Sequence, residues 1–136
     1  MILPNSWTNT TPPNSETEAV QFTAPAAYGF APTTYTVVSQ IGYVPTGETA
    51  HQLADKYIAN QKSAHPTFVA GDVMDCAVSA DTASFFSWSN AGTNAYDLIL
   101  IHNQLQYDVR LAGSGGLSDQ AFSDFKEIMA SWTWSA

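Results

Sequence analysis

The sequence predicts an α+β domain in which two helices pack on an antiparallel β-sheet to form an α/β/α sandwich. Two segments have apolar residues at helical spacing, and several others alternate apolar and polar residues as strands do. Short turn-forming segments separate most of the strands, and strands joined in this way pair antiparallel. The 136 residues, of which 45% are hydrophobic, are enough for a single domain with its own core.

Three strands are predicted in the first third of the chain, over residues 2–7, 19–23 and 34–41. A Thr-Pro-Pro-Asn turn at residues 11–14 separates the first two, because proline and asparagine favour turns. The third segment is rich in β-branched and aromatic residues, which favour strands. Residues 24–33 contain two prolines and a glycine and are predicted to form a loop.

A first helix is predicted over residues 48–64. Thr49 and Gln52 have the spacing of a capping box, in which each side chain binds the backbone of the other residue. The helix is expected to end at His65, because a residue that precedes proline avoids the helical conformation. Its apolar stripe comprises Ala50, Leu53, Ala54, Tyr57 and Ile58.

The middle of the chain is predicted to form two strands. Residues 74–78 alternate in polarity, and a turn at residues 80–82 leads to a second strand over residues 84–89. Residues 90–94 contain Gly92 and are predicted to form a loop. Cys76 is the only cysteine, so no internal disulfide is expected, and its apolar surroundings predict a small core residue with a protonated, unreactive thiol.

The clearest local pattern is a hairpin over residues 96–111. A two-residue turn at Asn103 and Gln104 sets Asp97 directly opposite Arg110, a favourable cross-strand pair. A slip of one residue would move every side chain to the other face of the sheet. One face then holds Tyr96, Leu98, Leu100, Leu105, Tyr107, Val109 and Leu111, and the other holds Asp97, Ile99, Ile101, Gln106, Asp108 and Arg110.

A second helix is predicted to close the domain. Ser118 is its expected N-cap, and Leu117 and Phe122 have the spacing of a hydrophobic staple. Trp134 is expected to follow in a short extended tail. The buried stripe of this helix comprises Leu117, Ala121, Phe122, Phe125, Ile128, Met129 and Trp132.

Six predicted features follow one another in a recognisable order. The first three are the strand of Trp7, the Val20-Gln21-Phe22 strand ending at Pro25, and the 48–64 helix. The last three are the strand pair around Cys76 and Phe86, the 96–111 hairpin, and the terminal 122–134 segment with its Phe-Lys-Glu-Ile-Met-Ala-Ser-Trp stretch. This order resembles the fold of the PsbP family, the oxygen-evolving-complex subunits of photosystem II. The same fold occurs in a Ran-binding nuclear import factor and in bacterial lipoproteins and sensor-protein domains. The resemblance implies one PsbP-like domain over residues 1–136 and a non-enzymatic role. It carries over no functional residue.

The charge of the chain disfavours several classes of partner. Four Lys and Arg residues stand against twelve Asp and Glu residues, for a net charge of −8. Nucleic-acid binding and docking on anionic lipid both need clustered cations, so we expect no nucleic-acid partner and no anionic-lipid surface. No apolar stretch reaches the ~18 residues of a membrane span, so no direct membrane insertion of this segment is expected.

The composition favours an extracytoplasmic protein. Only 12% of the residues are charged, about half the usual share, and Thr, Ser, Asn and Ala take their place. The segment that begins at Met1 lacks the basic and apolar regions of a signal peptide. We therefore expect a domain trimmed from a longer precursor that is secreted, lipid-anchored or the outer domain of a membrane protein.

Catalytic and metal-binding patterns are weak in this sequence. No two histidines have the spacing of metal ligands, and Asp72 and Asp75 fall on opposite faces of a strand, so no metal or other cofactor is expected. No G-x-S-x-G elbow is present. The Gly-Ser-Gly-Gly run at residues 113–116 lacks the lysine of a phosphate-binding loop.

The candidate binding residues are Asp97, Asp108 and Arg110, which share one face of the predicted hairpin. An arginine lowers the pKa of a neighbouring carboxyl group, which disfavours acid–base catalysis. The trio is either an ion-pair network or a site for a polar ligand.

We therefore predict a non-enzymatic interaction or sensor module with a protein partner. A carrier of a small ligand or metal ion is the alternative, at the Asp97, Asp108 and Arg110 face or in a pocket between helix and sheet. A hydrolase that uses Asp97, His102 or Asp108 is a further alternative.

Overall fold

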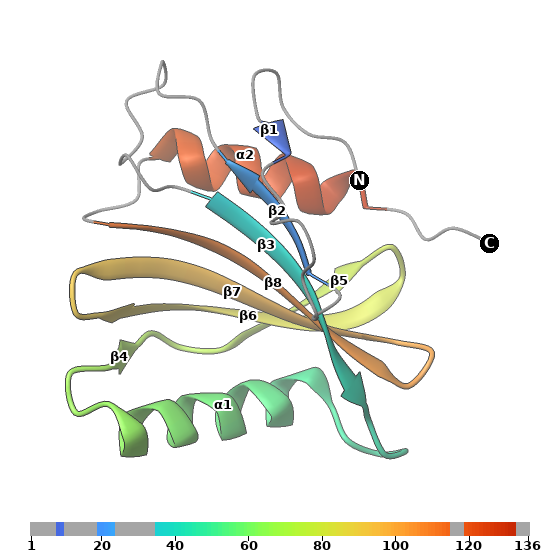
Figure 1. Cartoon of the computed structure of the whole chain (residues 1–136). Coiled ribbons are helices and arrows are strands. Elements are labelled where there is room, and N and C mark those ends of the chain that lie inside the picture. Colours follow the sequence, from blue (N-terminus) through green and yellow to red (C-terminus); the bar gives the residue numbers. More distant parts are fainter. Residues whose placement is uncertain (1–7, 10–18, 24–34, 115–118, 133–136) are drawn as a thin grey trace.

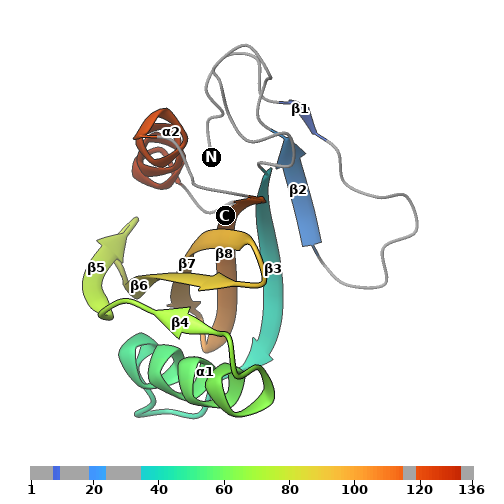
Figure 2. The same ribbon diagram turned by 90° about the vertical axis from the view of Figure 1, so that its left-hand side faces the viewer.

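The computed structural model describes residues 8–9, 19–23, 35–114 and 119–132. They form an eight-stranded sheet with one helix on each face, which confirms the predicted α+β sandwich (Figures 1 and 2). In chain order the elements are β1 Thr8–Asn9, β2 Ala19–Thr23, β3 Tyr35–Tyr43, α1 Ala50–Ala64, β4 Val69–Ala70, β5 Met74–Val78, β6 Asp81–Asn90, β7 Thr93–His102, β8 Leu105–Ser114 and α2 Asp119–Ala130.

Every pair of neighbouring strands is antiparallel, as predicted. The order across the sheet is β1-β2-β3-β8-β7-β6-β4, and β5 pairs with β6 beside β4. Strands β5 to β8 follow one another as hairpins, whereas β3 pairs with β8 after the excursion through α1. The sheet is therefore a meander whose far side is completed by strands from the start of the chain.

The β7–β8 hairpin has the predicted register. Asp97 pairs with Arg110, and the turn residues Asn103 and Gln104 have φ angles of 50° and 61°. Two consecutive left-handed residues are typical of the type I′ turn, whose twist matches that of the strands it joins. The alternation of side chains thus places the two predicted faces on the two sides of the sheet.

Two of the predicted connections are wrong in position or kind. The turn before β6 lies at Ser79 and Ala80, not at residues 80–82, and β6 begins at Asp81. The predicted loop at residues 90–94 is a tight turn in which Ala91 and Gly92 have φ angles of 49° and 87°, so β6 and β7 form a continuous hairpin. Left-handed conformations are uncommon for alanine and serine, and alanine does not signal a turn in a sequence.

Two strands of two residues each, β1 and β4, lie outside every predicted strand range. Strand β4 has only two residues, which pair with Ser89 and Trp88 of β6. A segment this short has no alternation that could reveal it.

Helix α1 has the predicted cap and the predicted buried stripe. The Thr49 hydroxyl accepts a hydrogen bond from the backbone N–H of Gln52, and the Gln52 side chain accepts one from the backbone N–H of Thr49. His65 is the C-cap. The stripe residues pack on the sheet against Phe86 and Ile99.

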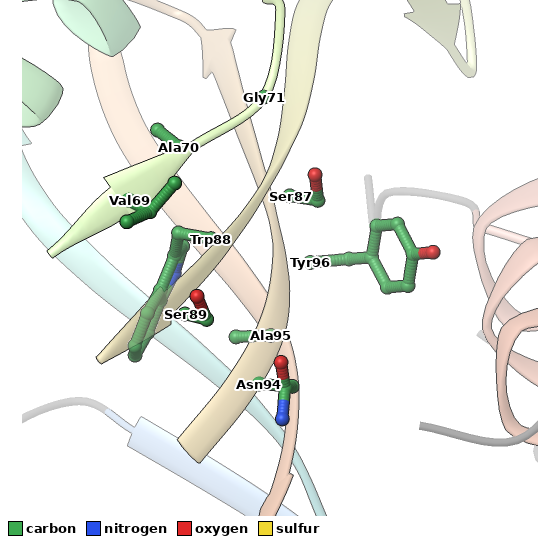
Figure 3. A pocket seen from close by; sticks show the side chains of 9 residues that line it. All are labelled: Val69, Ala70, Gly71, Ser87, Trp88, Ser89, Asn94, Ala95 and Tyr96. Carbon is green, nitrogen blue, oxygen red and sulfur yellow. The ribbon is translucent and has the colours of Figure 1, made fainter. Parts of the chain in front are cut away.

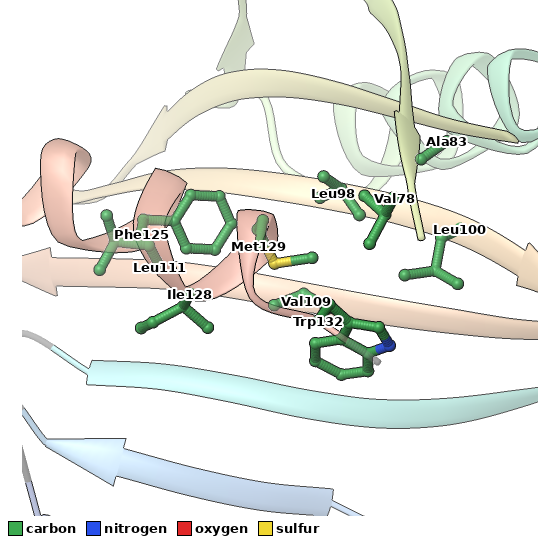
Figure 4. Close-up of a cluster of buried hydrophobic side chains, with 10 residues drawn as sticks. All are labelled: Val78, Ala83, Leu98, Leu100, Val109, Leu111, Phe125, Ile128, Met129 and Trp132. Atoms are coloured by element: carbon green, nitrogen blue, oxygen red, sulfur yellow. The ribbon is translucent and has the colours of Figure 1, made fainter. Parts of the chain in front are cut away.

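The larger core lies between the sheet and α2 (Figure 4). Phe125, Ile128 and Met129 of α2 and Trp132 are buried there, which confirms that part of the predicted stripe. They pack against the apolar face of the β7–β8 hairpin, with Leu98, Leu100, Val109 and Leu111.

Several predictions concern parts of the chain outside the described residues. They are the strand at residues 2–7, the loop at residues 24–33, the Ser118 cap, the staple of Leu117 and Phe122, and the tail of Trp134. In the part of the chain that the structure describes, no helix combines the length and apolarity of a membrane span.

Candidate functional site

The predicted trio of Asp97, Asp108 and Arg110 lies among polar side chains beneath α1. We use the name polar cluster for these three residues together with Tyr57 and Trp88. The Arg110 Nε donates to Asp97 Oδ1 at 2.8 Å, and its Nη2 donates to Asp97 Oδ2 at 3.2 Å. Trp88 Nε1 donates to the same Oδ2 at 2.7 Å. Asp97 is fully buried and accepts three hydrogen bonds, as a buried carboxylate requires.

Helix α1 closes this cluster from above. Arg110 Nη2 also donates to the Tyr57 hydroxyl at 2.9 Å, and the guanidinium carbon lies 5.3 Å from the centre of the Trp88 ring. The arginine is thus held by a carboxylate, a phenol and an aromatic face together. Such an arrangement stabilises a structural ion pair in which Asp97 is buried and the Arg110 side chain is 30% exposed.

Asp108 differs from Asp97 in its surroundings. Its Oδ1 atom is buried and has no hydrogen-bond partner among the described residues. Burial, followed by the negative charge of Asp97, raises the pKa of Asp108 well above its ordinary value, although Arg110 acts in the opposite direction. Arg110 thus lowers the pKa of Asp108 as expected, but burial and Asp97 outweigh it, so the trio does contain one carboxyl group of raised pKa.

The pKa of Arg110 is displaced in the direction expected for a buried ion pair. Burial alone would lower it, but the hydrogen bonds and charge of Asp97 outweigh burial and raise the pKa. Arg110 is charged at every accessible pH. The trio consequently combines the ion pair of Asp97 and Arg110 with one carboxyl group of raised pKa.

A second polar group, missed by sequence reasoning, lies where α1 begins. Asp75 Oδ1 contacts His51 Nδ1 at 2.7 Å and accepts a hydrogen bond from the Ser84 hydroxyl at 2.8 Å. These residues line a cavity of about 250 Å³ together with Cys76. Asp75 and Ser84 are direct cross-strand partners, so a correctly placed turn would have revealed that pair, whereas His51 is brought close only by tertiary packing.

The order of groups in this second cluster is not that of an activated serine. The carboxylate lies between the serine and the histidine, whereas catalysis needs the histidine to contact the hydroxyl. The hydrogen bond that His51 donates to Asp75 raises the pKa of His51, and the same bond lowers the pKa of Asp75. The pair is an exposed ionic contact between α1 and β5.

The opposite face of the sheet carries an open apolar groove. It lies between α2 and the β5–β6 hairpin and has a volume of about 270 Å³; we call it the α2–β5 groove. Lys126 is the one charged residue that lines it, and Met74 of β5 is 56% exposed on the same face. The groove is lined by Cys76, Ala77, Val78, Phe85, Leu98, Phe125, Lys126, Met129 and Ala130.

Cys76 lies at this groove but is not a reactive thiol. Burial, and to a smaller extent the charge of Asp75, raises its pKa. The thiol is therefore protonated at neutral pH, as the sequence predicted, and acts as a small apolar side chain.

A shallower hollow of about 340 Å³ lies beside β4, with Trp88, Asn94 and Tyr96 among its lining residues (Figure 3). Gly71 approaches β6 closely here, because a Cβ at this position would lie 2.6 Å from the Ser87 hydroxyl oxygen. The hollow mixes polar and apolar side chains and gathers no charged residue.

Metal-binding residues do not converge in the described part of the chain. No group of three or more His, Cys, Asp or Glu side chains there is arranged around a common point. His102 contacts Asp81 at 2.8 Å beside the hairpin turn, and His65 ends α1.

Comparison with known proteins gives a likeness of fold. No protein-family model and no curated protein matches the chain. The fold is similar to the solution structure of cyanobacterial PsbP (CyanoP) from Synechocystis sp. PCC 6803, with a TM-score of 0.55 and 9% identity. The similarity covers 93% of this chain and 78% of that one, which confirms the predicted PsbP-like fold. At this identity the likeness establishes the fold alone.

Proposed function

We propose that this chain is a non-enzymatic binding module, and that it holds a protein partner in the α2–β5 groove. The observation that carries the proposal is the contrast between the two faces of the sheet. On the α1 face, Arg110 and Asp97 satisfy each other, whereas on the α2 face apolar side chains line an open groove. Exposed apolar surface of this kind marks interaction sites more often than it marks ordinary surface.

A non-enzymatic role accords with the state of the reactive groups. The hydroxyl of Ser84 donates to a carboxylate, the thiol of Cys76 is protonated, and the raised pKa of Asp108 belongs to a carboxyl group whose Oδ1 atom is buried. None of these groups is combined with the base, oxyanion donors and accessible cavity that catalysis requires.

We further propose that the module is one domain of a longer extracytoplasmic precursor. Support comes from the low content of charged residues and from the PsbP-like fold. Expression of the full-length precursor with a tag at its C-terminus, followed by fractionation of the cells, tests this assignment. Recovery of the domain with cytoplasmic markers would count against it.

The groove is tested with an anionic apolar dye, anilinonaphthalene sulfonate, and backbone amide NMR. We expect the dye to shift the amides of the residues that line the groove. Ala130→Phe, which fills the groove from its rim, should weaken the binding, and the matched control Ala64→Phe at the end of α1 should not. Equal binding by both variants would show that the dye sits elsewhere.

A second candidate function is the carriage of a small polar ligand by Asp97, Asp108 and Arg110. The unpartnered Oδ1 of Asp108 favours it, because a buried acceptor without a donor is costly. Thermal unfolding in the presence of metal ions and small organic acids tests it. A ligand at about a hundred times its Kd stabilises the folded state by about 2.7 kcal/mol, and a flat panel would argue against a carrier.

A further inference from the structure

We infer that the α2–β5 groove binds an extended peptide segment of a partner protein, which adds to the sheet as a new strand along β5. The inference rests on the proposed function, because it names the form of the partner that the groove receives. Strand addition supplies affinity through backbone hydrogen bonds, and a neighbouring pocket supplies selectivity for alternate side chains.

The first observation is the position of β5 at an edge. It pairs with β6 on one side, and on its other side it has no strand partner among the described residues. Edge strands are commonly protected by charge, proline or a bulge. Strand β5 spans five residues with regular pairing to β6 and contains no proline. Its one charged side chain, Asp75, contacts His51 and Ser84.

The hairpin geometry shows which backbone groups face outward. The turn residues Ser79 and Ala80 both have left-handed φ angles, so Val78 and Asp81 form the hydrogen-bonded pair that closes a two-residue hairpin. Hydrogen-bonded and non-hydrogen-bonded pairs alternate along an antiparallel ladder. The N–H and C=O groups of Ala77 and Asp75 therefore point away from β6 and can pair with an incoming strand.

The second observation is the groove beside this edge. Met74, Cys76 and Val78 project from β5 onto the α2 face, and Phe125 and Met129 of α2 line the other side. The groove volume of about 270 Å³ lies just below the ~300–1,000 Å³ of pockets that enclose a whole small molecule. It matches one or two anchoring side chains of a longer segment better than an enclosed ligand.

The third observation is charge. Lys126 is exposed at the groove in a chain whose net charge is −8. The partner segment that fits carries apolar side chains at alternate positions and a carboxylate close to them, and it is otherwise free of acidic residues.

The experiment selects decapeptides from a phage-displayed random library on the immobilised chain and titrates the selected synthetic peptide into the isotope-labelled protein. We expect selected sequences with alternating apolar residues and one acidic residue. The backbone amides of Asp75 and Ala77 should gain protection from hydrogen exchange, and the groove residues should shift.

Three variants separate the parts of the inference. Ala77→Pro removes an outward N–H without removing a bond to β6 and should weaken peptide binding at least tenfold. Lys126→Glu should also weaken it, whereas Lys62→Glu, the same change on α1, should not. The exchange measurement on the unaltered chain stands in for Ala77→Pro if that variant fails to fold.

The outcomes distinguish the inference from the proposed function beneath it. Peptides or dye that shift the groove residues but leave the Asp75 and Ala77 amides unprotected would overturn strand addition and leave the groove as a binding site. If neither peptide nor dye shifts the groove residues, both the inference and the proposed function are overturned. Concentration-dependent self-association through β5 without peptide binding would identify a second copy as the occupant and overturn the inference.

Discussion

Replacing Asp108 by asparagine removes the carboxyl group of the polar cluster that has a buried oxygen without a hydrogen-bond partner among the described residues. Asp97 accepts hydrogen bonds from Arg110 and Trp88, but Asp108 Oδ1 has no donor among the described residues. Asparagine keeps the shape of the side chain and cannot ionise. We therefore expect Asp108→Asn to stabilise the protein at neutral pH.

The size of the gain depends on pH, and its sign follows from proton linkage. The pKa of Asp108 is raised well above the 3.8 of an ordinary aspartate, so the folded state keeps a proton that the unfolded state has lost. Its contribution to stability is complete below the unfolded pKa and is lost as the pH rises toward the folded pKa. In that window the variant should gain up to about 1.4 kcal/mol over the natural protein for each pH unit.

The assay is urea unfolding of both proteins at pH values from about 3 to about 8, with the free energy extrapolated to water. Asp72→Asn, which removes the same charge from an exposed site, controls for net charge. The difference between Asp108→Asn and the natural protein should rise above pH 4 or so and then level off. A difference that is independent of pH, or that falls as the pH rises, would refute the assignment of a raised pKa to Asp108.

Three other changes test neighbouring contacts. Arg110→Met leaves the fully buried carboxylate of Asp97 without its cation, so urea unfolding should show a free energy of unfolding lower by about 3–5 kcal/mol. A loss under about 1 kcal/mol would contradict a buried ion pair. Tyr57→Phe removes one hydrogen bond to the guanidinium and should cost about 1 kcal/mol in the same assay, and no measurable cost would show that bond to be unimportant. NMR titration should show the pKa of His51 above 6.5, because the Asp75 carboxylate stabilises the protonated ring. Asp75→Asn should lower the pKa of His51, and the contact should weaken as the pH rises through this pKa. An unchanged titration in the variant would exclude the contact in solution.

The sequence predicted the hairpin of β7 and β8 in detail because two independent signals agreed. Alternating polarity defined its two faces, and the pairing of Asp97 with Arg110 was consistent with only one register. The Ala91-Gly92 turn was missed because alanine in a left-handed conformation has no sequence signature. Local sequence patterns therefore predicted the strands and turns correctly wherever each residue adopts the backbone conformation that its type prefers.

The candidate sites were less accessible to sequence reasoning. The trio of Asp97, Asp108 and Arg110 could be placed on one face, but the burial that raises the pKa of Asp108 depends on how closely α1 covers the sheet. The α2–β5 groove depends on the line along which α2 crosses the sheet, and no spacing of residues encodes that line. Whether Asp97, Asp108 and Arg110 bind a ligand stays a prediction.

The topology also has a consequence for the order in which the domain folds. Strands β5 to β8 join neighbours in the chain through short turns, so this meander needs only local loop closure. Strand β3, by contrast, pairs Tyr35 with Ala112 and Tyr43 with Leu105, contacts of high sequence separation that form slowly. On the ribosome, β2 and β3 emerge first and the strand that completes their side of the sheet is made last. We therefore expect the nascent domain to remain open along β3 until β8 has left the exit tunnel.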